Sequence, residues 1–178
     1  MDDFQFPLRV EKLRERLTQD NLDAIFISNT ENRRYISGFE SSAGYLILTQ
    51  NDAVLCTDFR YTEQASQQAP GWRIDRIGGK PDWLAALVNE LKIEVLGFEA
   101  DDMTVDTLDR FRKSLNNNNA NPTLRPTSSI CLELRSCKDD VELALLQHAI
   151  DIGDQAFEET AAQLRVGMSE KEAAWIFE

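Results

Sequence analysis

The stretch YLILTQNDAVLCT, residues 45–57, decides the fold of this chain. Residues 45–49 and 53–57 are short apolar runs with the composition of β-strands, and the polar triplet QND between them has the length of a hairpin turn. Two strands joined by so short a turn run antiparallel. We therefore expect a mixed β-sheet rather than a purely parallel one.

On both sides of this hairpin, segments of helix type and strand type alternate along the chain. Helices are expected over residues 7–17, 61–68, 81–91 and 105–115, and strands over residues 24–27, 72–77, 93–98 and 123–125. Such alternation predicts an α/β fold in which helices flank the mixed β-sheet.

From residue 136 onward the pattern is helical only, so C-terminal helices should follow the sheet. Ser136 is expected to cap a long helix that Gly167 ends, and a capping box at residues 169–172 opens another helix. The apolar residues 173–177 have little in this chain to bury them. We expect the protein to continue beyond residue 178; the alternative is a natural C-terminal helix docked on the sheet.

Composition narrows the classes of partner and location. The 178 residues carry a formal net charge of −12, which argues against nucleic acid as a partner because phosphate backbones are bound by Lys and Arg. No apolar run approaches the length of a membrane span and the N-terminus is acidic, so we expect no membrane partner and a cytoplasmic location. The three cysteines lack CxxC spacing and are expected to be reduced and mostly buried.

Motifs that would carry chemistry are missing or incomplete. GGK at residues 78–80 lacks the first glycine and the hydroxyl residue of a phosphate loop and is interpreted as a turn before a helix. His148 is the only histidine and has no HExxH or HxH spacing. The acidic residues of 99–102 and of 139–140 are interpreted as helix-opening acids. We therefore expect no catalytic residue and no metal site in this chain.

Two segments are less well explained by structural propensity. Residues 32–44 are expected to form a loop between strands that exposes Tyr35 and Phe39, and residues 58–61 follow the second strand of the hairpin. Large aromatic residues on a loop carried by a rigid sheet are typical of a binding surface. The alternative is a loop packed by its own aromatic side chains.

The order of these motifs resembles a known family. The matching residues are Asn32, Tyr35, Ser37, Gly38, Phe39, Asp58, Arg60, Tyr61, Arg135, Lys138 and Glu142. Together they resemble the creatinase-type N-terminal domain of Xaa-Pro dipeptidases and Xaa-Pro aminopeptidases, which are pita-bread metallopeptidases. The resemblance implies that residues 1–130 form this N-terminal α/β domain, and that residues 131–178 form a linker and the first helices of a truncated catalytic domain.

The same resemblance implies the chemistry of the parent protein. Such enzymes use two divalent metal ions (Mn, Co or Zn) to activate a water that attacks the bond before proline in short peptides. Their ligands are two Asp, one His and two Glu located deeper in the catalytic domain than this chain reaches, and His148 does not match the ligand histidine. This chain alone is therefore expected to be inactive.

The resemblance also implies that the N-terminal domain forms a homodimer, in which a loop of one subunit covers the active site of the other. The residues expected to form this substrate-access loop are Tyr35, Phe39, Glu40, Ser41, Ser42, Arg60 and Tyr61. A structural role for Arg60 and Tyr61, with Asp58 paired to Arg60, is the alternative. Three other functions stay open: a non-catalytic creatinase-like scaffold module, a creatinase-type amidinohydrolase, and a free-standing α/β binder of small ligands.

Overall fold

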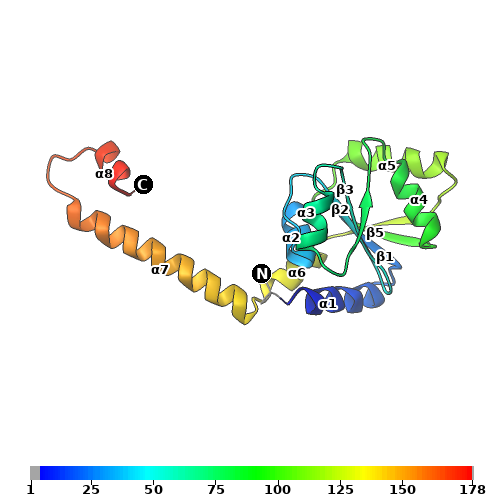
Figure 1. Cartoon of the computed structure of the whole chain (residues 1–178), viewed down its shortest axis with the longest axis horizontal. Coiled ribbons are helices and arrows are strands. Elements are labelled where there is room, and N and C mark those ends of the chain that lie inside the picture. The colour runs from blue at the N-terminus through cyan, green and yellow to red at the C-terminus, as the bar shows by residue number, and fades with distance from the viewer. Residues whose placement is uncertain (1–4, 178) are drawn as a thin grey trace. The chain divides into compact units, whose positions relative to one another are not determined.

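The computed structural model describes residues 5–177, which form two compact units, residues 5–136 and residues 137–177. The elements of the first unit are α1 (Phe6–Gln19), β1 (Ala24–Ile27), α2 (Thr30–Ser37), β2 (Tyr45–Thr49), β3 (Ala53–Thr57), α3 (Thr62–Gln68), β4 (Arg73–Arg76), α4 (Asp82–Glu90), β5 (Val95–Glu99), α5 (Val105–Asn117), β6 (Thr123–Thr127) and α6 (Ile130–Ser136) (Figure 1). The second unit contains α7 (Asp140–Gln163) and α8 (Glu170–Phe177).

The first unit is built on a six-stranded sheet with the strand order β4-β3-β2-β1-β5-β6. β2 runs antiparallel to both of its neighbours, β1 and β3, whereas the pairs β1–β5, β5–β6 and β3–β4 are parallel. In the hairpin, Leu46 lies opposite Leu55 and Ile47 opposite Val54. The prediction of a mixed sheet flanked by helices is confirmed.

The two edges of the sheet carry residues that discourage further pairing. β4 is one edge, and its Arg73 forms ion pairs with Asp75 and with Glu90 of α4. β6 is the other edge and contains Pro126, which has no backbone N–H to donate.

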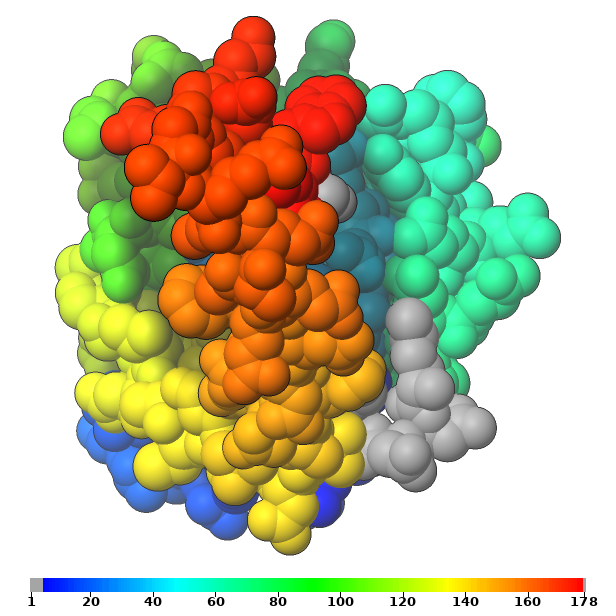
Figure 2. Space-filling model, turned by 90° about the vertical axis from the view of Figure 1, so that its left-hand side faces the viewer, coloured from blue at the N-terminus to red at the C-terminus, as the bar shows by residue number. Residues whose placement is uncertain are grey.

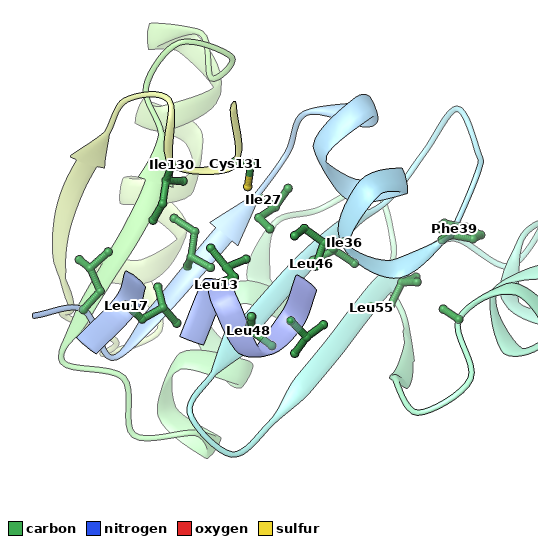
Figure 3. Close-up of a cluster of buried hydrophobic side chains, with 14 of the residues drawn as sticks. Leu13, Leu17, Ile27, Ile36, Phe39, Leu46, Leu48, Leu55, Ile130 and Cys131 are labelled. Carbon is green, nitrogen blue, oxygen red and sulfur yellow. The ribbon is translucent and has the colours of Figure 1, made fainter. Parts of the chain in front are cut away.

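Helices cover both faces of the sheet because side chains alternate along each strand. Ile25 and Ile27 of β1 point to the face covered by α1, α2, α3 and α6, and their cluster is shown in Figure 3. Ala24 and Phe26 point to the opposite face, which α4 and α5 cover. Burying one isoleucine or phenylalanine contributes about 1.5–3 kcal/mol, so both clusters stabilise the sheet.

The segment before the hairpin differs from its prediction. Residues 30–37 form helix α2 rather than a loop, with the side chain of Asn29 accepting a hydrogen bond from the backbone N–H of Asn32. Gly38 ends the helix in the left-handed conformation (φ 79°), and a Cβ there would lie 2.9 Å from the ring of Phe6. Both the conformation and the space at this position favour glycine.

The start of the long helix also differs from its prediction. Ser136 does not cap it; it is the last residue of α6, and its hydroxyl donates to the carbonyl of Glu133 at 2.6 Å. The N-cap is Asp139, which forms a reciprocal capping box with Glu142. The expected second capping box, between Ser169 and Glu172, is confirmed.

The second unit presents apolar side chains at its surface. None of the described residues of α7 or α8 is buried, and Phe157 and Trp175 are 66% and 78% exposed. The side chains of these two helices form the orange-to-red surface that faces the viewer in Figure 2. Over residues 5–177, no helix combines the length and apolar character that crossing a membrane requires.

Candidate functional site

The segment that follows α2, residues 39–44, is named the access loop here. It begins with Phe39, which is fully buried (0% exposed) and packs edge-on against the ring of Tyr61, with 6.4 Å between the ring centroids. The guanidinium of Arg33 lies 5.7 Å from the centroid of the Phe39 ring. The prediction that Phe39 is exposed is wrong, because its ring anchors the loop from inside.

Arg33 fixes the far end of the access loop. Its guanidinium donates hydrogen bonds to the carbonyl oxygen of Gly44, at 2.7 Å, and to that of Ser41. Arg33 is only 2% exposed, and burial lowers the pKa of its guanidinium. No role was predicted for Arg33, because its carbonyl partners come from the following loop and meet it only in the folded chain.

Further hydrogen bonds tie the middle of the access loop to α3 and β3. The backbone N–H of Glu40 donates to the side chain of Gln68, and the side-chain amide of Gln64 donates to the Glu40 carbonyl at 2.6 Å. The hydroxyl of Thr57 donates to the carbonyl of Ala43 at 2.8 Å. The loop is therefore held at nearly every residue.

The side chains of the access loop differ in what they present to solvent. The Ser42 hydroxyl lies 2.8 Å from the hydroxyl of Tyr61, and Ser42 itself is exposed. Glu40 is also exposed and forms an ion pair with Arg34 at 3.4 Å. Ser41 is half-buried, and its hydroxyl donates to the carbonyl of Ala43. Glu40 and Ser42 are thus the side chains that a ligand could reach.

Arg60 is held by Asp58 at the end of β3. Two nitrogens of its guanidinium donate to the Asp58 carboxylate at 3.0 and 2.7 Å, and its guanidinium carbon lies 5.2 Å from the centroid of the Tyr61 ring. The hydrogen bond from Arg60 lowers the pKa of Asp58. The predicted pairing of Asp58 with Arg60 is confirmed, and it orients Arg60 over Tyr61.

Tyr35 lies apart from the other predicted site residues. Its hydroxyl donates to the carbonyl of Leu134 in α6 at 3.1 Å. The guanidinium of Arg9 stacks on its ring at 4.1 Å and donates to its backbone carbonyl. The structure thus brings together residues 39–42, Arg60 and Tyr61, and places Tyr35 in the packing between α1, α2 and α6.

A cleft of about 550 Å³ opens beside the access loop, at the carboxyl ends of β1, β3 and β4. Its lining residues are Ser28, Thr30, Arg33, Ser42, Ala43, Gly44, Tyr45, Asp58, Phe59, Arg60, Ile77, Gly78 and Gly79. Crevices at the carboxyl ends of strands are where open α/β sheets usually bind ligands.

A buried carboxylate behind α2 was missed by sequence analysis. Glu99 accepts hydrogen bonds from the backbone N–H groups of Ser28 and Asn29, each at 2.8 Å, and from the side-chain amide of Asn32 at 2.6 Å. Asn32 in turn accepts a hydrogen bond from Arg135 at 2.9 Å. Burial raises the pKa of Glu99. The interpretation of Glu99 as a helix-opening acid is wrong, because it ends β5 and joins α2 to α6.

The side chains of residues 5–177 do not fit the pair of metal ions that the family resemblance implies. Within residues 5–177, no three or more His, Cys, Asp or Glu side chains are grouped so that they could hold a metal ion. All three cysteines are free; Cys56 and Cys131 are buried and Cys137 is exposed. No catalytic step through a metal can be assigned to these residues.

Comparison with known proteins agrees with the fold and the motifs. A family model described as the Creatinase/Prolidase N-terminal domain matches residues 9–137. The chain is 34% identical over 164 residues to the uncharacterized peptidase YqhT of Bacillus subtilis (strain 168), which covers 92% of this chain and 45% of that protein.

Solved structures extend this agreement. The Xaa-Pro dipeptidase from Bacillus anthracis superposes with a TM-score of 0.89 at 34% identity, over 98% of this chain and 48% of that one. The N-terminal domain of the cytoplasmic peptidase PepQ from Mycobacterium tuberculosis H37Rv superposes with a TM-score of 0.65 at 36% identity, over 71% of this chain and 98% of that domain. The chain thus spans less than half the length of the first two relatives, at their N-terminal part. It belongs to the family of creatinase/prolidase N-terminal domains.

Proposed function

We propose that this chain is the N-terminal part of a metal-dependent Xaa-Pro peptidase, a dipeptidase or an aminopeptidase. The observation that carries the proposal is the similarity to the Xaa-Pro dipeptidase from Bacillus anthracis, which extends through 98% of this chain at 34% identity. In this proposal residues 1–130 are the N-terminal domain, and residues 131–178 are the linker and first helices of the catalytic domain.

The proposed role of the N-terminal domain is to form a homodimer and to narrow access to the partner's active site. The access loop, with Arg60 and Tyr61 beside it, would line the entrance for short proline-containing peptides. Its many tethers support this role, because a loop that is already ordered loses little conformational entropy when substrate binds. Phe39 acts in this scheme as an internal anchor, and Tyr35 as a support of α2. Glu40 and Ser42 face the substrate, and the half-buried Ser41 helps to hold the loop in shape.

Catalysis itself is assigned to residues outside this chain. Two divalent metal ions, Mn, Co or Zn, would supply the activated water in the full-length enzyme, and this chain alone would be inactive. A cytoplasmic location stays a prediction; a solved relative is described as a cytoplasmic peptidase.

Turnover of a Leu-Pro dipeptide tests the activity. The full-length protein, loaded in turn with each of the three metals, should hydrolyse it, and the 178-residue chain should not. Turnover by the isolated chain would refute the fragment role, absence of any Xaa-Pro hydrolysis by the full-length protein would refute the peptidase role, and hydrolysis of creatine instead would identify an amidinohydrolase.

A pair of variants tests the access loop in the full-length protein. Glu40→Ala removes an exposed carboxylate from the loop, and Glu63→Ala removes one from the exposed surface of α3. We expect Glu40→Ala to change kcat/KM for Xaa-Pro dipeptides severalfold and Glu63→Ala to leave it unchanged. Equal kcat/KM values for both variants and the wild type would exclude a role of Glu40 in substrate access. Light scattering of the full-length protein tests the homodimer.

A further inference from the structure

Arg33 is a buried cation that forms no ion pair with another residue of 5–177. Its guanidinium reaches the carbonyls of Gly44 and Ser41, and its Nε has no hydrogen-bond partner within residues 5–177. Glu31 and Asp102 are near enough to influence its charge, but neither forms an ion pair with it. Because a buried charge is costly unless it is paired, a bound anion at this position would stabilise it.

Arg33 lines the cleft at the carboxyl ends of the strands, and the other charges of that lining cancel. The charged lining residues are Arg33, Asp58 and Arg60. Arg60 is neutralised by its paired hydrogen bonds to Asp58. The lining therefore keeps one net positive charge, that of Arg33, in a protein whose formal net charge is −12.

The walls of the cleft add uncharged donors and space. α2 begins at Thr30 on this cleft, and the first turn of a helix leaves backbone N–H groups without partners inside the helix. The Thr30 hydroxyl makes no hydrogen bond to another described residue and is exposed. Gly78 and Gly79 line the cleft as well, and a Cβ at either position would have no atom within 4 Å.

We propose that this cleft binds a small oxyanion, a carboxylate or a phosphate group, as the counter-ion of Arg33. The Thr30 hydroxyl and the backbone N–H groups of Thr30 and Glu31 are the donors that would hold its oxygens, with the charge of Arg33 beside them. The N–H of Asn32 is already bonded to the side chain of Asn29. The site lies within one copy of the chain and does not rest on the proposed peptidase function.

A titration of the ¹⁵N-labelled 178-residue chain by NMR tests this site. Sodium phosphate and sodium acetate are added in separate series at constant ionic strength, and the Arg33 Nε–H and the amides of Thr30 and Gly79 are followed. We expect saturable shifts of these signals, with a Kd on the order of 1 mM or tighter. Saturation by phosphate alone identifies a phosphate group as the ligand, and saturation by acetate alone identifies a carboxylate.

A matched pair of substitutions separates a specific site from general ionic effects. Gly79→Asp places a carboxylate on the cleft wall and should weaken oxyanion binding at least about tenfold, whereas Gly79→Asn, of the same shape, should retain it within about twofold. Both residues have room at this position, so the comparison does not require replacing Arg33, which anchors the access loop. The proposal would be overturned if the chemical shifts failed to saturate, or if Gly79→Asp and Gly79→Asn bound the oxyanion with equal affinity.

Discussion

Replacing Phe39 by alanine tests how the access loop is anchored. The ring is fully buried against Tyr61 and Arg33, so its removal leaves a cavity that these neighbours can fill only in part. Truncation of a buried phenylalanine to alanine costs about 3–5 kcal/mol of unfolding free energy. Had the ring been exposed, as the sequence suggested, the change would stay within about 0.5 kcal/mol.

Phe59→Ala is the matched control, because Phe59 belongs to the same unit, residues 5–136, and is 66% exposed. Urea unfolding followed by tryptophan fluorescence measures both variants. The chain has three tryptophans, and a Trp175→Phe background leaves only Trp72 and Trp83, which both lie in the unit of residues 5–136.

We expect Phe39→Ala to lower the unfolding free energy by at least about 3 kcal/mol and Phe59→Ala by no more than about 0.5 kcal/mol. Phe39→Leu, which keeps most of the apolar volume, should fall between them. A loss below about 1 kcal/mol for Phe39→Ala, or equal losses at the two positions, would show that the ring does not anchor the loop.

Three further outcomes follow from other parts of the structure. Because burial raises the pKa of Glu99, the folded state binds the proton of the Glu99 carboxyl group more tightly than the unfolded state does. The unfolding free energy should therefore decline as pH rises above about 4.3, the ordinary glutamate pKa. Glu99→Gln should flatten that decline in urea titrations from pH 4 to 7. Gly38→Ala should cost about 1–2 kcal/mol, because its φ is positive and its Cβ would meet a ring of α1, whereas Gly79→Ala should be nearly neutral in the same thermal melts. Cys137 should react with a thiol reagent in the native chain, whereas Cys56 and Cys131 should react only after denaturation, because burial shields both thiols and raises their pKa. Rapid modification of all three cysteines in the native chain would contradict the burial of Cys56 and Cys131.

The sheet could be predicted because its signals are local. The runs at residues 45–49 and 53–57 each alternate between the two faces, and the triplet between them fits only a tight turn. The same holds for helices such as α1 and α4, since each of them buries an apolar stripe of its own. Periodicity and turn chemistry therefore sufficed for the α/β class.

Helix α2 was missed because its buried face is mostly polar. Arg33 and Ser37 are buried there beside Ile36, so the helix shows little apolar periodicity. The carbonyls that satisfy Arg33 come from Ser41 and Gly44 in the following loop, and this pairing appears only once the chain is folded. The cap residue Asn29 and the glycine at position 38 were the local signals of this helix.

The start of α7 illustrates a choice between two local signals. Ser136 and Asp139 are both good N-cap residues. Asp139 is selected because the carboxylate of Glu142, three residues later, accepts a hydrogen bond from the backbone N–H of Asp139, while Ser136 is used at the end of α6. The hydrogen bonds around Glu99 could not be predicted either, because Asn32, Glu99 and Arg135 come from three distant segments of the sequence and meet only in the folded chain.

The edges of the sheet bear on how two copies of this chain could associate. A second copy that extended the sheet at β6 would find a proline where a backbone donor is needed, and at β4 it would have to displace the ion pairs of Arg73 with Asp75 and Glu90. Continuous intermolecular sheets, and the fibrous aggregates that grow from them, are therefore disfavoured at both ends. We therefore expect the proposed homodimer to form through helix and loop surfaces, with an interface that depends on side-chain complementarity rather than on shared backbone hydrogen bonds.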